Sequence, residues 1–288
     1  MIPSSLRKTK LIVTLVSLLC SLFAHGDIAS AVAAMEDSDN PLIEVNTSKG
    51  TLYIELHPAE APKNVARFLA LAKGEIGFTD QELGTTYYPR YFDGMIFHRV
   101  LPEFVIQAGS PFLNPLGAPV QLLEDEINAT ALGLDVELVL LPDASLNPIL
   151  NINHGDDFSE QVLQPLYTAM EITTPEQVIS QQQKIVERLR SLSIKQLYQM
   201  QGYRFSETLT SRSISRGSLA LANTGPDSNG AEFFLSLAPQ EHLTGKYTSI
   251  GTVVEGLDVM DEIGKIQILA SQPSRSSTTI YSIKEINK

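Results

Sequence analysis

The chain has 288 residues, enough for one large domain or two small ones, and its 43% hydrophobic and 19% charged residues are ordinary for a globular protein. Its formal net charge of −12 argues against a broad nucleic-acid-binding surface, which needs clustered Lys and Arg. The five histidines show no ligand spacing, so we expect no metal site.

The N-terminus has the order of a secretory signal peptide. Basic residues within 7–10 precede the apolar run 11–24, and small residues follow up to position 34. The run is short for a membrane span, which needs about 20 residues, so an uncleaved anchor is the less favoured alternative. We predict a signal peptide over residues 1–33, cleaved somewhere in 26–34, and an exported chain without stable membrane insertion. Cleavage would remove Cys20, the only cysteine.

Short β-rich runs separated by turn signals dominate the rest of the chain. They predict strands at 42–45, 52–56, 95–101, 104–107, 218–222, 233–237, 247–254 and 279–286. Helical spacing of apolar residues predicts a helix before Gly74 and another over 257–266. Many short antiparallel strands with few helices favour a barrel or a sandwich.

The run 91–109 places the cation Arg99 among alternating apolar residues. On a regular strand, Phe97 and Arg99 point to one face and His98 to the other, so we expect Arg99 on an apolar face and a structural role for His98. A charge on an apolar face is costly unless it has a partner or a function.

Residues 131–204 differ in character, because strand signals fade and Gln and Leu become frequent. Thr174, Pro175 and Gln177 form a capping-box pattern ahead of a striped helix, and 160–170 predicts a shorter one. This segment is interpreted as an α-helical insertion. The sequence leaves open whether it is a packing appendage or an arm that docks a protein partner or substrate.

Two further motifs lie downstream: LANTGPDSNGAEFF (221–234) and LTGKYTSIG (243–251). Together with FHRV (97–100) and FVIQAG (104–109), they resemble the cyclophilins, a family of peptidyl-prolyl cis-trans isomerases. The resemblance covers roughly residues 41–125 and 215–287. It implies a mainly β fold, a closed eight-stranded antiparallel barrel with two capping helices, here as a domain over 41–288 that residues 131–204 interrupt.

The resemblance also implies a reaction. Rotation about an Xaa-Pro bond takes tens to hundreds of seconds, because amide resonance must be broken. In the transition state the prolyl nitrogen has lost its conjugation with the carbonyl group. A guanidinium that donates to this nitrogen therefore binds the transition state more strongly than the planar amide, which accelerates the rotation. The expected substrates are proline-containing polypeptides, no cofactor or metal is required, and the expected role is to assist folding of exported proteins in the bacterial periplasm.

Site residues follow from the same resemblance. Arg99 matches the catalytic arginine, Gln107 its supporting glutamine, Phe104, Val105, Phe234 and Leu243 the walls of the proline pocket, Ala222 and Asn223 the positions that hold the peptide backbone, and Tyr247 a pocket-lining position. Some have a plainer interpretation as well: a lone arginine in a strand is usually a solvated or paired surface residue, Phe104 and Phe234 fit a core, and Asn223 fits a turn.

Several positions depart from the family pattern, among them Ala108 and Ser110, which replace a glycine and an aspartate, and two departures bear on function. Glu232 replaces a glutamine near the substrate, and its carboxylate could pair with Arg99, hold it or compete with substrate. His242 replaces a tryptophan that many members use to bind cyclosporin, so we expect weak cyclosporin binding. Glu232 favours the alternative function, a non-catalytic proline-peptide-binding module or chaperone, with the insertion as its working surface.

Overall fold

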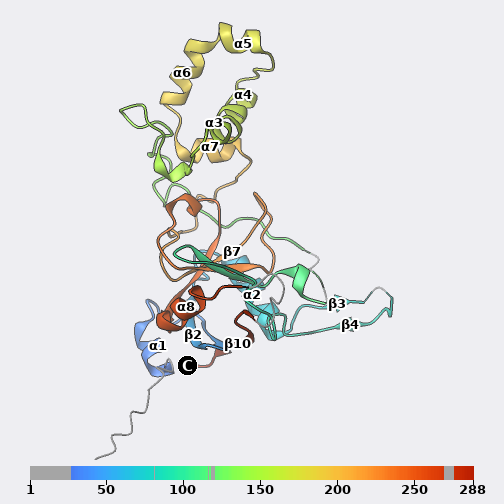
Figure 1. Cartoon of the computed structure of the whole chain (residues 1–288). Helices are drawn as coiled ribbons and strands as arrows, with labels where there is room; N and C mark the ends of the chain where they lie inside the picture. Colours follow the sequence, from blue (N-terminus) through green and yellow to red (C-terminus); the bar gives the residue numbers. More distant parts are fainter. Residues whose placement is uncertain (1–26, 81, 116, 118–120, 269–275) are drawn as a thin grey trace, which may run out of the picture.

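The computed structural model describes residues 27–80, 82–115, 117, 121–268 and 276–288; residues 1–26 of the predicted signal peptide lie outside this range. It has a β body, from one end of which a group of short helices projects as a tower (Figure 1). The strands are β1 (Leu42–Thr47), β2 (Gly50–Leu56), β3 (Phe78–Thr79), β4 (Thr86–Tyr87), β5 (Arg99–Leu101), β6 (Val105–Ala108), β7 (Ser218–Leu221), β8 (Phe233–Ser236), β9 (Ser249–Glu255) and β10 (Ile280–Ile286). The body also contains α1 (Ile28–Ala34), α2 (Pro62–Lys73), α8 (Leu257–Gly264) and the 3-10 turns η1 (Pro111–Leu113) and η4 (Glu241–Leu243).

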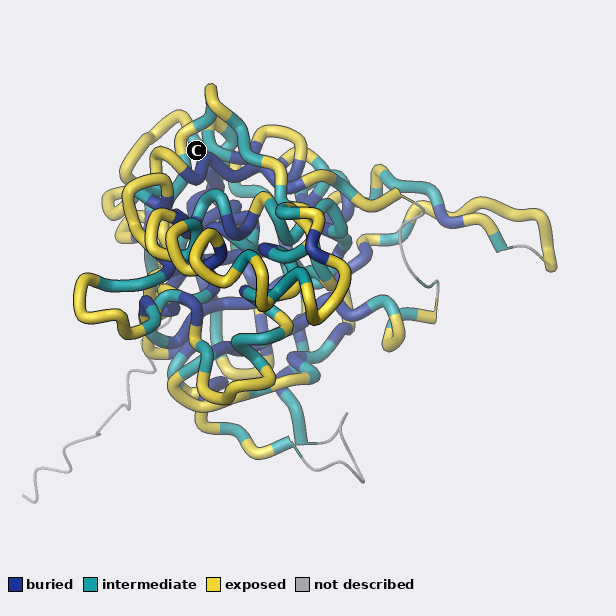
Figure 2. The backbone as a smooth tube through the Cα atoms, turned by 90° about the horizontal axis from the view of Figure 1, so that it is seen from above, coloured by how far each residue is buried: buried dark blue, intermediate teal, exposed yellow. Residues whose placement is uncertain are grey.

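Eight strands form one antiparallel sheet in the order β10-β1-β2-β9-β7-β8-β6-β5. The predicted strands are confirmed with shifts at their ends, except that only 99–101 of the run 95–101 is a strand. The β3–β4 hairpin, which the pattern missed because its strands are two residues long, projects from the body (Figures 1 and 2).

The sheet is an open half-barrel, so the predicted closed barrel is wrong. Edge strands β5 and β10 share no ladder within the described residues. The residues ahead of β5 meet the β10 side through the isolated bridge Ile96↔Thr279 and the hydrogen bond from Phe97 N to Thr278 O, 2.9 Å.

Helix α2 covers one part of the sheet because its apolar residues recur at helical spacing, which buries Val65, Phe68 and Leu71. Gly74 ends α2 as predicted. Its φ of +75° is left-handed, and a Cβ there would lie 2.9 Å from the carbonyl oxygen of Tyr88.

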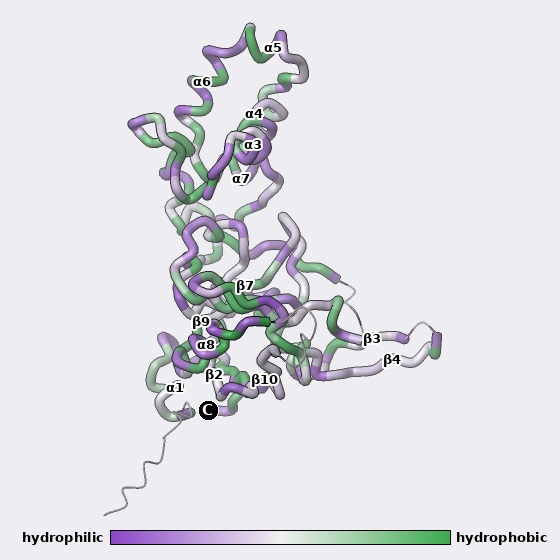
Figure 3. Tube along the Cα trace, in the orientation of Figure 1, coloured by the Kyte–Doolittle hydropathy of each residue, from purple (hydrophilic) through white to green (hydrophobic). Residues whose placement is uncertain are grey.

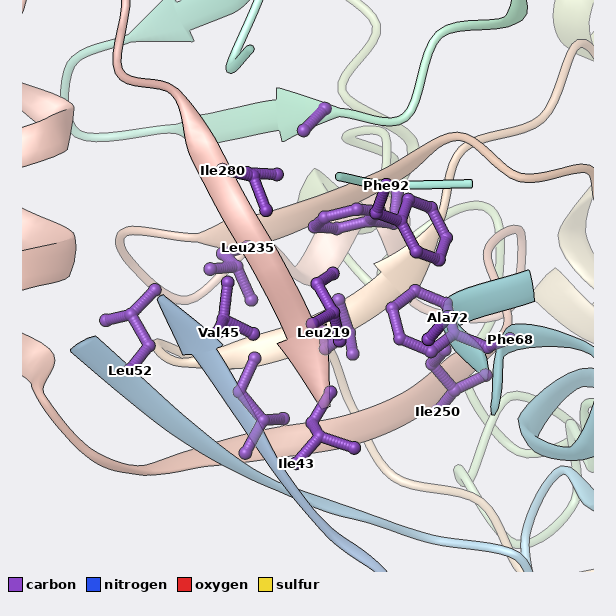
Figure 4. Close-up of a cluster of buried hydrophobic side chains, with 14 of the residues drawn as sticks. Ile43, Val45, Leu52, Phe68, Ala72, Phe92, Leu219, Leu235, Ile250 and Ile280 are labelled. Carbon is purple, nitrogen blue, oxygen red and sulfur yellow. The ribbon is translucent and has the colours of Figure 1, made fainter. Parts of the chain in front are cut away.

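The core lies between the sheet, α2 and α8, and draws on both halves of the chain (Figure 4). Its centre is aromatic: the Phe233 ring meets Phe68 and Phe92 edge-on, each at 5.5 Å between centroids. Residues on either side of the insertion therefore pack into one core, and the insertion interrupts the sequence without dividing the fold.

The tower contains η2 (Pro148–Leu150), α3 (Gly155–Phe158), the π-helical turn η3 (Ser159–Leu163), α4 (Gln164–Ala169), α5 (Pro175–Ser180), α6 (Gln182–Arg190) and α7 (Ile194–Met200). The predicted capping box is present, since the Thr174 side chain accepts a hydrogen bond from Gln177 N. The helix expected after it is broken at Gln181 into α5 and α6, along which polar and apolar residues alternate (Figure 3). Two apolar clusters fill the tower, so it has a core of its own.

Helix α1 and the residues after it pack against the β body and form hydrogen bonds with it. Ala31 is fully buried against Leu42 and Tyr53, and the buried Glu55 carboxylate accepts hydrogen bonds from the backbone N–H groups of Glu36 and Asp37. None of the helices in the described part of the chain is long and apolar enough to cross a membrane.

We expect a pH dependence of stability from His57, which is buried beside this N-terminal segment. Burial, and then the Arg212 charge, lower the pKa of His57, although Glu60, Glu55 and Glu36 act against this change. As pH falls below the ordinary histidine pKa of about 6.5, His57 becomes protonated in the unfolded chain before it does so in the folded chain. The free energy of unfolding therefore decreases as pH falls. Thermal unfolding should therefore occur at a lower temperature at about pH 5.5 than at about pH 7.5.

His57→Gln, which cannot titrate, is the matched control and should flatten this dependence. His242 contributes in the same direction, because burial and the Lys246 charge lower its pKa as well. Some dependence should therefore remain, and an unchanged slope in the variant would exclude His57 as a source.

Candidate active site

Cross-strand partners build a row of side chains on the face of the sheet opposite the core. Arg99 pairs with Gln107, Gln107 with Phe234, and Phe234 with Ala220. The row is outward because side chains alternate along each strand: Phe233 joins the core, whereas Phe234 joins a second apolar cluster with Val105 and Ala220. A run of directly paired residues on β5, β6, β8 and β7 thus forms a surface outside the core.

Arg99 lies on this outer face, and the expectation that it shares a face with Phe97 is wrong. Phe97 is fully buried in the core, and Val100 packs against that core from β5, while Arg99 is exposed. The alternation changes parity because the strand begins only at Arg99, after the irregular residue His98. Arg99 therefore avoids the desolvation cost that a regular strand would impose.

A cavity of about 240 Å³ lies at this row. Its lining contains nine of the ten predicted site residues: Arg99, Phe104, Val105, Gln107, Ala222, Asn223, Phe234, Leu243 and Tyr247. Glu232, the tenth, lines an adjacent cavity of about 290 Å³ that shares Gln107, Ala222 and Asn223. The structure thus gathers residues that are up to 148 positions apart in sequence, from Arg99 to Tyr247 (247 − 99).

Aromatic contacts fix the cavity walls. The Phe234 and Tyr247 rings meet edge-on at 5.5 Å, and the Arg99 guanidinium carbon lies 5.9 Å from the centre of the Phe104 ring. His242 stacks on Phe104 at 5.7 Å between centroids. Sequence reasoning identified His242 only as a replaced tryptophan and missed this contact, for which its position beside Leu243 was the only signal. Its lowered pKa favours the neutral ring at neutral pH.

A chain of hydrogen bonds holds the arginine. Arg99 Nη1 donates to Gln107 Oε1 at 3.0 Å, Gln107 Nε2 donates to Glu232 Oε1 at 2.5 Å, and His98 Nε2 lies 3.0 Å from the same carboxylate oxygen. The Glu232 carboxylate thus interacts directly with Gln107 and His98, and the hydrogen bonds that link it to Arg99 pass through the Gln107 amide. The guanidinium remains open to the cavity.

The charge of Glu232 is stabilised at this position. Burial raises the pKa of Glu232, but hydrogen bonds from His98 and Gln107, with the charges of His98 and Arg99, outweigh burial and lower it overall. The carboxylate is therefore ionised at neutral pH, where it orients the Gln107 amide so that its oxygen faces Arg99.

We expect Glu232→Gln to change kcat/KM only slightly, because an amide oxygen still accepts the hydrogen bond from Gln107. Glu232→Leu removes the acceptor and should lower kcat/KM by roughly tenfold, the equivalent of one lost hydrogen bond of about 1–1.5 kcal/mol. Steady-state kinetics on one Xaa-Pro peptide compare the two variants. A large loss in Glu232→Gln would show instead that the negative charge itself is needed.

Asn223 lies where the two cavities meet. Its side-chain amide donates to Lys246 O at 3.0 Å, and its side-chain oxygen accepts from Gly225 N at 3.3 Å. The Asn223 side chain therefore joins the 221–230 turn to the segment that carries Tyr247. Its hydrogen bond with Gly225 N also agrees with the plainer interpretation of Asn223 as a turn residue.

The structure is thus an antiparallel half-barrel that presents an arginine in an outer cavity with several apolar wall residues. The chain belongs to the family described as cyclophilin type peptidyl-prolyl cis-trans isomerase, whose family model matches residues 42–285. It is a peptidyl-prolyl cis-trans isomerase, like its named relatives.

Among these relatives, peptidyl-prolyl cis-trans isomerase ppi1 of Schizosaccharomyces pombe is 26% identical over 225 residues, which cover 78% of this chain and 86% of the relative. Peptidyl-prolyl cis-trans isomerase B of Streptomyces anulatus is 26% identical over 236 residues, 81% of this chain and 86% of the relative. The crystal structure of a cyclophilin type peptidyl-prolyl cis-trans isomerase of Cryptosporidium parvum is 17% identical with a TM-score of 0.47, and the match covers 86% of this chain and 99% of that one.

Proposed function

We propose that the 240 Å³ cavity binds the proline side of an Xaa-Pro bond in a polypeptide and that Arg99 is the catalytic residue. As the bond twists, the prolyl nitrogen loses conjugation and gains a basic lone pair. The Arg99 guanidinium donates to that lone pair, an interaction that is stronger in the transition state than in the planar amide. An arginine side chain presents a planar fork of N–H donors, which suits this task.

The remaining residues position the substrate. Phe104, Val105, Phe234 and Leu243 hold the proline ring in an apolar environment while the preceding residue rotates. Gln107 keeps the guanidinium directed at the cavity through its 3.0 Å hydrogen bond. Ala222 and Asn223, at the junction of the two cavities, hold the peptide backbone.

The single observation that carries this proposal is that the exposed Arg99 lines the same cavity as the apolar side chains of Phe104, Phe234 and Leu243. A protease-coupled assay on an Xaa-Pro tetrapeptide tests it, because the protease cleaves only the trans form. We expect the wild-type chain to accelerate the slow cis-to-trans phase. Peptide binding without acceleration would favour the non-catalytic binding module instead.

We further propose that the protein acts on exported polypeptides in the bacterial periplasm. The order of basic, apolar and small residues at the N-terminus supports export. The packing of α1 favours cleavage at the start of the proposed window 26–34, because a later cut would remove Ala31 from its buried place. Fractionation of cells followed by N-terminal sequencing tests both points: we expect a periplasmic chain that begins near Asp27, and a cytoplasmic chain with an intact N-terminus would contradict them.

A further inference from the structure

The tower reaches the wall of the proline cavity at Gly245. This glycine lies between Leu243 and Tyr247, which both line the cavity. A Cβ at Gly245 would lie 2.4 Å from Leu134 Cδ1 and 3.3 Å from the Tyr198 ring, and its φ of +84° is left-handed. Leu134 and Tyr198 both belong to the buried cluster of the insertion. The turn that carries two pocket residues is therefore packed directly on the core of the tower.

Lys246 makes a second contact at the same place. Its ammonium lies 4.7 Å from the centre of the Tyr198 ring, which is a cation–π distance. Burial lowers the pKa of Lys246, and this partly desolvated cation gains from the face of the ring. The carbonyl oxygen of Lys246 accepts the hydrogen bond from Asn223, so the contact extends to the residue proposed to hold the peptide backbone.

The tower also contacts the cavity wall at the 3-10 turn that precedes Gly245. The insertion's η2 (Pro148–Leu150) lies against η4 (Glu241–Leu243). η4 carries Leu243 of the cavity and His242, which stacks on Phe104. The insertion therefore contacts the segment 241–247 at both ends of its pocket-lining stretch.

We propose that the insertion is a positioning element for the proline pocket and that Tyr198 is its central positioning residue. The Leu134–Tyr198 surface and η2 together hold segment 241–247 so that Leu243 and Tyr247 close one side of the cavity. This inference rests on the assignment of that cavity as the proline site. It gives the insertion a role in the reaction that is neither that of a packing appendage nor that of a docking arm for a partner.

The positions of these residues determine whether a change in the insertion alters KM or kcat. Arg99 and Gln107 lie on β5 and β6, whereas the insertion contacts segment 241–247. A loosened 241–247 segment should therefore weaken the grip on the proline ring and raise KM, while it leaves the guanidinium and kcat less affected.

Tyr198→Leu in the full-length chain tests the proposal. We expect KM for an Xaa-Pro tetrapeptide to rise roughly tenfold, less than the roughly 100-fold that a 1 Å misplacement of catalytic groups can cost, with a smaller change in kcat. Tyr198→Phe should behave as wild type, because the buried Tyr198 hydroxyl has no hydrogen-bond partner within the described structure. Lys246→Met, which keeps the stem and removes the charge, provides a second variant should Tyr198→Leu fail to fold.

The matched control is Leu166→Ala. Leu166 is fully buried in the second cluster of the tower, with Ile172 and Ile185, and that cluster includes none of the cavity-lining residues. The Leu166→Ala substitution should lower the unfolding temperature and leave KM unchanged. An unchanged KM in folded Tyr198→Leu and Lys246→Met, or an equal rise in Leu166→Ala, would overturn the proposal. Full activity in Arg99→Ala would instead show that the pocket assignment is wrong.

Discussion

Arg99→Ala is expected to lower kcat/KM for an Xaa-Pro peptide by roughly 100-fold or more, the usual cost of removing one donor that stabilises a transition state. Binding of the same peptide should weaken only modestly, because the apolar walls of the cavity remain. The reason is that the guanidinium gains its interaction with the prolyl nitrogen only as the amide twists. Protease-coupled kinetics and a calorimetric titration of the peptide measure the two quantities.

Arg99→Lys is the control that separates charge from geometry. Lysine keeps the cation but loses the planar fork that allows Arg99 to bind Gln107 and still face the cavity. We expect activity between those of wild type and the alanine variant. If Arg99→Ala lost binding and turnover to the same extent, Arg99 would be a docking residue.

Phe233→Ala is expected to have the largest effect on folding, a loss of about 3–5 kcal/mol in the free energy of unfolding. Phe233 is 1% exposed and meets Phe68, Phe92 and Phe97 edge-on, so its removal leaves a void that rigid rings on several sides cannot fill. Urea denaturation measures the loss. The kinetic constants of the folded fraction should change little, because the side chain faces away from the cavity.

Phe234→Ala is the matched variant one residue along β8. Phe234 faces the open cavity, where water can enter the space that the ring leaves, so we expect a smaller loss of stability than in Phe233→Ala. Its KM should rise, because the proline ring loses one wall. If Phe234→Ala matched Phe233→Ala in stability and kept the wild-type KM, the outer face of the sheet would not be the binding face.

Much of the fold could be predicted because its signals are local. Short β-rich runs between turn signals identified the strands, Gly74 marked the end of α2, and Thr174 marked the start of α5. Open or closed pairing at the sheet edges could not be predicted, because it depends on contacts between residues far apart in the sequence, such as Ile96 and Thr279. The face of Arg99 was predicted wrongly for a different reason: one irregular residue, His98, reverses the parity that alternation assumes.

The lining of the candidate cavity could be predicted as a set of residues, but the hydrogen bonds among its side chains could not. The motifs identified the lining of the cavity, yet the partner of Glu232 depends on which side chains lie across neighbouring strands, here Gln107 and His98. The contact between Tyr198 and Gly245 also could not be predicted from the sequence. It joins two segments that the pattern treated as separate bodies, and it is visible only in three dimensions.

Exchange spectroscopy on an Ala-Pro peptide tests the central claim most directly, since it follows interconversion of the cis and trans resonances without a coupled protease. With catalytic amounts of the wild-type protein, exchange cross-peaks should appear within the mixing time. With Arg99→Ala they should vanish, although the peptide resonances still shift on addition of the variant. Cross-peaks of equal intensity with both proteins would contradict a reaction that takes place beside Arg99.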